Sequence, residues 1–219
     1  KRSLTYLLLD AVPPEKPLPP DRRTVGSKGL PKLQAKSILA IRKARSLAMA
    51  HAELLQTLDM ERPVTRYRTT LEEDPAEWGR RMREALDLKA LRNAEITTKQ
   101  ALELAIEAVS GLGILVLRLS MPQEGLRGFA LMDEDVPVIA IKRGGGEALS
   151  VKLFTLMHEL GHVLLREGSI CDMKEQNTMP IEKWCNAFAA EAIYPQAELL
   201  AHPTVREHRR QSLGSTWRH

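Results

Sequence analysis

The sequence is poor in aromatic residues and in cysteine. Phe, Trp and Tyr make up 4% of its 219 residues, so aliphatic side chains and methionine must fill most of the core. The two cysteines, Cys171 and Cys185, exclude a scaffold of several disulfides and are typical of a reducing compartment. No apolar run reaches the length of a membrane span, and the short run at residues 5–9 precedes prolines instead of a cleavage site. We therefore expect a cytoplasmic protein without a membrane segment.

Charge of neither sign dominates, since 32 Lys and Arg against 28 Asp and Glu leave a formal net charge of +4. The basic residues gather in residues 1–68 and in the tail 206–219. A run of charge usually marks a solvated face, but a basic surface also attracts nucleic acid. This N-terminal region could therefore contact DNA, although no recognised DNA-binding motif accompanies the charge. The basic residues that motivate this expectation are Lys32, Lys36, Arg42, Lys43 and Arg45.

Composition and periodicity divide the chain into four segments. Five prolines within residues 13–20 favour an extended arm. Apolar residues then recur at helical spacing over residues 33–58, and Asp74-Pro75 is a typical start of a further helix. The predicted segments are a proline-rich extended arm or linker (1–32), a helical N-terminal region (33–96), a mixed domain (97–205) and a basic C-terminal tail (206–219).

The mixed domain is predicted to be α+β. A helix over residues 98–109 precedes short apolar runs at 114–119, 128–132 and 138–141, which turn residues separate. These runs predict a small antiparallel sheet of about three strands. Helices are expected over residues 148–166 and 181–193, followed by a short one before Pro203. A glycine run before a helix, as at residues 144–146, can bind phosphate, but the rest of a phosphate-loop pattern is missing, so we interpret it as a plain loop.

The sequence His-Glu-Leu-Gly-His at residues 158–162 carries the strongest chemical signal. Two histidines four residues apart lie on one face of a helix, where both can hold one zinc ion. Glu159 would lie beside the metal, able to take a proton from the activated water and pass it to the leaving amine. The surrounding residues are almost all apolar, so the helix should be buried, and a metal explains polar residues there. Gly161 is expected to give room for close approach beside the metal.

A catalytic zinc usually has a third protein ligand. We expect it to be Glu182 at the start of the next helix, with Glu191 as the alternative. Asn186, one turn after Glu182, could then orient a ligating histidine through a hydrogen bond. The two cysteines could also bind zinc, but each is interpreted as a small buried hydrophobe. Two histidines and a carboxylate tolerate other ions such as manganese.

Two residues after this helix, Tyr194 and His202, are candidates to donate a hydrogen bond to the oxyanion that forms on a scissile carbonyl.

Two blocks of sequence resemble the ImmA/IrrE family of metallopeptidases. They are Phe-Thr-Leu-Met-His-Glu-Leu-Gly-His-Val-Leu-Leu at residues 154–165 and Glu-Lys-Trp-Cys-Asn-Ala-Phe-Ala-Ala-Glu at 182–191. The resemblance extends from about residue 111 to 195. It implies a zincin-like fold, zinc held by His158, His162 and Glu182, and catalysis by Glu159. The sequence departs from the family at Ala-Ile-Tyr-Pro, residues 192–195, where Leu or Ile and then Met usually precede the proline.

The resemblance also implies a substrate, because family members cleave helix-turn-helix repressors and so relieve repression of stress-response or mobile-element genes. Residues 21–24 are similar to the connector that follows a helix-turn-helix module in some members, and such a module would precede Lys1. Two other functions compete: a non-catalytic, zinc-containing regulator that binds a repressor, and a protein that binds DNA. The intact Glu159 counts against a purely structural metal site.

Overall fold

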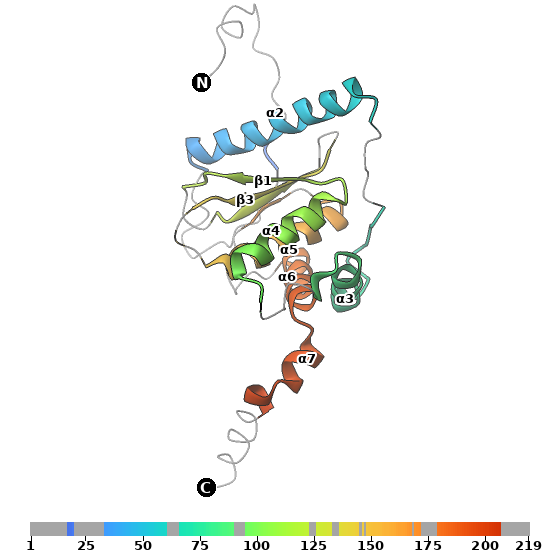
Figure 1. Cartoon of the computed structure of the whole chain (residues 1–219). Helices are drawn as coiled ribbons and strands as arrows, with labels where there is room; N and C mark the ends of the chain where they lie inside the picture. Colours follow the sequence, from blue (N-terminus) through green and yellow to red (C-terminus); the bar gives the residue numbers. More distant parts are fainter. Residues whose placement is uncertain are drawn as a thin grey trace, which may run out of the picture.

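A mixed sheet lies between two layers of helices (Figure 1). The computed structural model describes residues 17–19, 33–60, 66–89, 95–122, 126–132, 136–144, 146, 148–167, 169–171 and 179–206. The predicted arm and tail lie almost wholly outside these residues. The helices are α2 (Ala35–Thr57), α3 (Pro75–Ala85), α4 (Thr98–Ser110), α5 (Leu149–Leu164), α6 (Pro180–Ile193) and α7 (Gln196–Ala201). The strands are β1 (Leu115–Leu119), β2 (Gly128–Leu131), β3 (Val138–Lys142) and β4 (Ser169–Cys171).

The sheet confirms the three expected strands and corrects their arrangement. In the described residues the strand order is β1-β3-β2-β4. β2 pairs antiparallel with β3 and with β4, whereas β1 pairs parallel with β3, with Leu115 opposite Val138. The prediction of a wholly antiparallel sheet was wrong because β3 returns between β1 and β2 instead of adding to the outside. β4 was missed because three residues are too short to show an alternating pattern.

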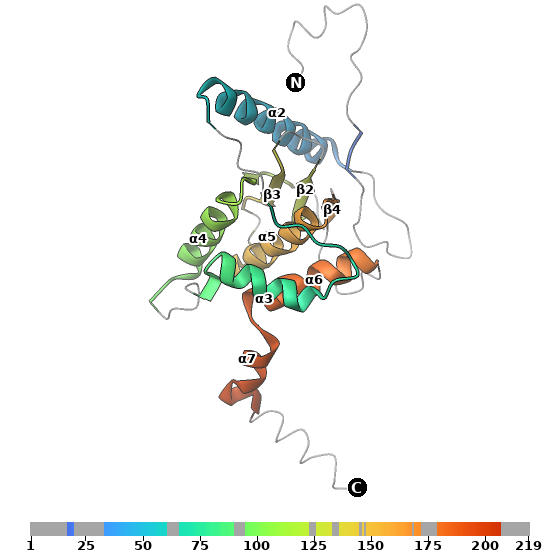
Figure 2. The ribbon, with the colours of Figure 1, turned by 90° about the vertical axis from the view of Figure 1, so that its right-hand side faces the viewer.

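The two faces of the sheet are covered by different helices (Figures 1 and 2). α2 crosses one face and buries Ile41, Ala44 and Ala48 against residues such as Phe129 and Leu131. α5 packs on the opposite face, where the core also contains residues of α4 and α6. Since successive side chains of a strand point to opposite faces, β1, β2 and β3 each contribute to both cores. The α+β class and the helical N-terminal region are confirmed.

Local sequence explains where the helices begin. The Asp74 carboxylate accepts a hydrogen bond from the Ala76 amide at 2.9 Å, and Pro75 occupies the first turn of α3. Thr97 and Gln100 form a reciprocal capping box at the start of α4. Both helix starts were expected from the sequence.

The helix that completes the candidate site, α6, is held along its length by α3. A Cβ atom added at Gly79 would lie 2.8 Å from the Phe188 carbonyl oxygen, so the two helices approach closely here. The buried Arg83 guanidinium donates to the carbonyl oxygens of Ala192 at 3.1 Å and Ile193 at 2.7 Å. A cation that binds the last carbonyls stabilises a helix end, so α3 both packs against α6 and caps it.

The predicted domain boundaries stay a prediction, although α2 and α3 pack directly on elements of the 97–205 segment. Among the described helices, none combines the length and the apolar character that crossing a bilayer requires.

Candidate metal centre

α5 presents the two histidines of the motif to the same point. His158 and His162 are separated by one helical turn, and their Nε2 atoms lie 3.3 Å apart. Both side chains are fully buried. The pairing follows from the four-residue spacing alone, once the helix is formed.

α6 brings a carboxylate to these two nitrogens. Glu182 lies in the first turn of α6 and is 1% exposed. Its Oε2 atom is 3.1 Å from His158 Nε2, and its Oε1 atom is 3.3 Å from His162 Nε2. The three side chains offer one ligand atom each within 4.8 Å of one another.

The spacing of these atoms fits one tetrahedral metal ion. Ligands bound at 2.0–2.1 Å in a tetrahedron lie roughly 3.3–3.4 Å from each other. The two histidine nitrogens are 3.3 Å apart, and each has a Glu182 oxygen at 3.1 or 3.3 Å, a different oxygen for each histidine, so the spacing is close to that value. Two imidazole nitrogens and one carboxylate oxygen are also a ligand set that zinc accepts while keeping a fourth position for water or substrate. The residues present therefore fit a catalytic metal.

Asn186 holds one of the histidines in the required protonation state. His158 Nδ1 lies 3.0 Å from Asn186 Oδ1. An amide oxygen only accepts hydrogen bonds, so Nδ1 carries a proton and donates it, which makes Nε2 the nitrogen that would bind a metal. The expected hydrogen bond between Asn186 and a histidine of the motif is present.

The Glu182 carboxyl is ionised at neutral pH. Burial by itself would raise its pKa, but hydrogen bonds from His158 and His162, together with the charge these rings can carry, lower the pKa to about 2. The cluster therefore contains an ionised carboxylate before any ion binds, and a bound metal would replace the protons that the histidine Nε2 atoms share with it.

Glu159 is fully buried next to the first histidine, and its carboxylate lies against the backbone of β2. A Cβ atom added at Gly128 would come within 2.9 Å of Glu159 Oε1 and 2.8 Å of Thr155 Cγ2. Only a residue without a side chain leaves this space for the carboxylate. Sequence reasoning missed Gly128, although a glycine at the start of an apolar strand was a signal of close backbone approach.

Gly161 provides close approach of a different kind from the one expected. A Cβ atom there would lie 3.0 Å from Cys185 Sγ and 3.3 Å from Cys185 Cα. The glycine therefore lets α6 lie close to α5, which sets how near Glu182 comes to the histidines. Cys185 is fully buried within the apolar core, as expected for a small hydrophobe. The Cys171 side chain lies outside what the structure describes.

Glu191, the alternative third ligand, has other partners. Its Oε1 atom accepts from Arg80 Nη1 at 3.0 Å, and its Oε2 atom accepts from the Gln196 amide at 2.9 Å. These bonds join α6 to α3 and to the start of α7. Of the two candidates, the structure brings Glu182 to the histidines.

Tyr194 and His202 are not brought to the cluster. Tyr194 is half-buried at the C-terminal end of α6, roughly 18 Å along the helix from Glu182. His202 is exposed at the end of α7, which leads away from the domain (Figures 1 and 2). The placement gives no support to their expected contact with an oxyanion, and that role stays a prediction.

A buried His-His-Glu cluster on two packed helices beside a small sheet defines a zincin-like peptidase domain. The family model described as the IrrE N-terminal-like domain, Peptidase_M78, matches residues 109–218, which is half of the chain. The chain belongs to this ImmA/IrrE family of metallopeptidases. No curated protein matches it.

Proposed function

We propose that this chain is a zinc-dependent endopeptidase whose active site is formed by His158, His162, Glu182 and Glu159. The observation that supports it most directly is that the Glu182 carboxylate and the Nε2 atoms of His158 and His162 converge, with contacts of 3.1–3.3 Å, so that one ion can reach all three side chains. The family match supports a peptidase independently of this geometry.

Each residue of the site has a distinct part in the proposed mechanism. His158, His162 and Glu182 would hold zinc, which when bound supplies Lewis-acid polarisation of the scissile carbonyl and makes water more acidic. Glu159 takes the proton of the attacking water and then delivers it to the leaving amine nitrogen, so the carboxylate is regenerated at the end of the cycle. Asn186 keeps the proton of His158 on Nδ1 throughout. Gly128 leaves the space that the Glu159 carboxylate occupies.

The proposed substrate is a helix-turn-helix transcriptional repressor, and its cleavage in the cytoplasm would relieve repression of stress-response or mobile-element genes. This part rests on the resemblance of residues 154–165 and 182–191 to the family. DNA contact by the basic face of α2 stays a prediction.

The test compares Glu159→Gln with the wild-type chain. Both are loaded with zinc and incubated with candidate helix-turn-helix repressors, whose intact mass is then measured. Glu159→Gln should keep bound zinc and lose cleavage by about 10²–10⁴-fold, because only the proton carrier is removed. His162→Ala is the matched control and should lose both zinc and cleavage.

Cleavage by Glu159→Gln at the wild-type rate would contradict the role of this carboxylate. Binding of a repressor by the zinc-loaded wild type without any change of its mass would favour the competing function, a non-catalytic regulator.

A further inference from the structure

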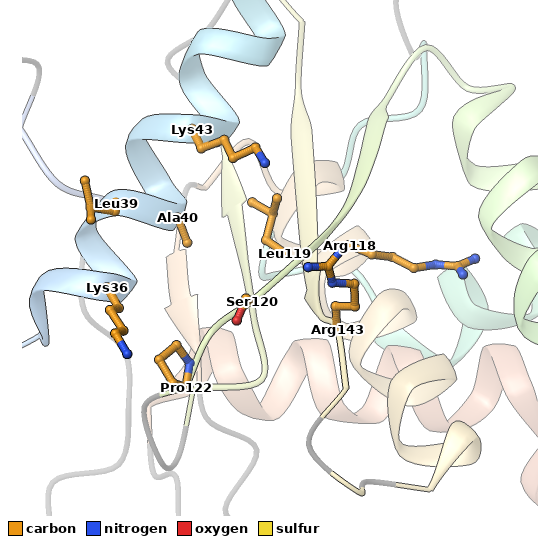
Figure 3. A pocket seen from close by; sticks show the side chains of 9 residues that line it. All are labelled: Lys36, Leu39, Ala40, Lys43, Arg118, Leu119, Ser120, Pro122 and Arg143. Atoms are coloured by element: carbon orange, nitrogen blue, oxygen red, sulfur yellow. The ribbon is translucent and has the colours of Figure 1, made fainter. Parts of the chain in front are cut away.

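A cavity lies on the face of the sheet that α2 covers, away from the two histidines. It occupies about 310 Å³ between α2 and the ends of β1 and β3 (Figure 3). Leu119 in its wall belongs to the apolar core under α2, whereas the candidate metal centre is built on α5 and α6 across the sheet. A cavity of this volume is at the lower end of the range for small-molecule sites.

Cationic side chains line this cavity, and none of the described residues in its wall is acidic. Lys36 and Lys43 come from α2, and Arg143 directly follows β3. No hydrogen bond or ion pair joins the side chains of these three residues to other residues in the described part of the chain. The fourth cation, Arg118, points away toward α4 (Figure 3), where it pairs with Glu103. The uncompensated charge is therefore that of Lys36, Lys43 and Arg143.

The remaining wall is apolar and exposed. Leu39 is 45% exposed, and Pro122 is also exposed at the rim, while Leu119 forms a buried part of the wall. Leu39 and Pro122 offer a surface for an apolar or flat group next to the cations. The cavity thus has the two kinds of lining that a ligand with an anionic end and an apolar body requires.

The backbone holds the two strand ends together at this point. The Arg143 amide donates to the Leu119 carbonyl oxygen at 2.8 Å, one residue beyond the parallel pairing of β1 and β3. Ligands of α/β sheets commonly bind outside the carboxyl ends of parallel strands. Arg143 is therefore placed by the sheet, whereas Lys36 and Lys43 are placed by α2.

We propose that this cavity binds a small molecule that carries a phosphate group on an apolar or aromatic body, such as a mononucleotide. The phosphate would lie among Lys36, Lys43 and Arg143, and the body would pack on Leu39 and Pro122. A compact ligand suits the site better than a nucleic-acid strand, because a strand would need a continuous row of unpaired basic side chains along α2 beyond the cavity, and α2 does not provide one. Further along α2, Arg45 donates a hydrogen bond to the Pro17 carbonyl oxygen at 2.7 Å.

The test is calorimetric titration of the zinc-loaded full chain with adenosine 5′-monophosphate, adenosine and inorganic phosphate. Adenosine 5′-monophosphate should bind at least about tenfold more tightly than adenosine, because the phosphate meets three cations. The double variant Lys36→Gln/Lys43→Gln should bind the nucleotide at least about tenfold more weakly than wild type. Both lysines are exposed, so the fold should survive their replacement, and thermal unfolding checks this.

Lys99→Gln is the matched control, since Lys99 is an exposed lysine on α4 outside this cavity. It should leave nucleotide affinity unchanged. Rising salt should weaken binding to the wild type more than to the double variant.

Three results would overturn the proposal. They are equal affinity for the nucleotide in wild type and Lys36→Gln/Lys43→Gln, equal affinity of wild type for the nucleotide and adenosine, and binding of a single-stranded oligonucleotide without binding of the mononucleotide.

Discussion

Replacing Asn186 by Ala should weaken zinc binding without touching any metal ligand. The Asn186 side chain accepts the hydrogen bond from His158 Nδ1 at 3.0 Å and so fixes both the tautomer and the orientation of that ring. Loss of such an outer hydrogen bond typically costs 10–100-fold in metal affinity, or about 1.4–2.7 kcal/mol. Under saturating zinc, the metal-dependent stabilisation of the fold should fall by a similar amount.

The assay is competition for zinc between the protein and a chromophoric chelator at neutral pH, with thermal unfolding at fixed free zinc as a second readout. Asn186→Asp is the matched control, because its carboxylate still accepts from His158 Nδ1 and should keep zinc affinity at or above the wild-type value. The reasoning is refuted if Asn186→Ala binds zinc within about twofold of wild type, or if Asn186→Asp loses as much affinity as Asn186→Ala.

Three further predictions concern residues around the site. Gly128→Ala would place a Cβ atom 2.9 Å from Glu159 Oε1, so repressor cleavage should fall at least about tenfold while zinc content, measured by atomic absorption, stays unchanged. Arg83→Met removes a buried cation from the last carbonyls of α6 and should lower the free energy of unfolding in urea by about 2–4 kcal/mol, whereas Arg80→Met, on an exposed side chain, should cost less than about 1 kcal/mol. The pKa of the Glu182 carboxyl is lowered from 4.5 to about 2 in the folded protein. The ionised carboxylate therefore stabilises the metal-free fold above about pH 4.5, and this stabilisation is lost as the pH falls toward 2. The difference in urea midpoint between metal-free wild type and Glu182→Gln should therefore shrink as the pH falls from about 5 to about 2, and a constant difference would contradict this.

The features that the sequence predicted correctly are those that depend on neighbours along the chain. The spacing of His158 and His162 determines that both imidazoles face one point, because four residues make about one helical turn. Asp74 and Thr97 mark helix starts because their side chains bond amides two or three residues away. The hydrogen bond between Asn186 and a histidine could be predicted for the same reason, because Asn186 lies one helical turn after Glu182, the expected third ligand.

The strand order and the position of Gly128 against Glu159 depended on contacts between distant segments. No local pattern shows that β3 lies between β1 and β2, since β2 and β3 are both buried along almost their whole length and neither sequence indicates which neighbour it pairs with. A glycine in a strand indicates close approach without saying what approaches. The cavity under α2 was missed for the same reason, because Lys36 and Lys43 lie 100 residues or more before Arg143 in the sequence.

By itself, then, the sequence determined a buried helix with two metal-binding histidines and the family to which it belongs. Only the tertiary structure decided which glutamate joins them. Glu182 and Glu191 are nine residues apart, which at about 100° per residue places them on opposite sides of α6. α6 turns its Glu182 side to α5, where Gly161 admits Cys185, and its Glu191 side to Arg80 of α3. From its sequence alone, the helix could have presented either carboxylate to the histidines. The packing of its two sides against α5 and α3 determines that Glu182 faces them.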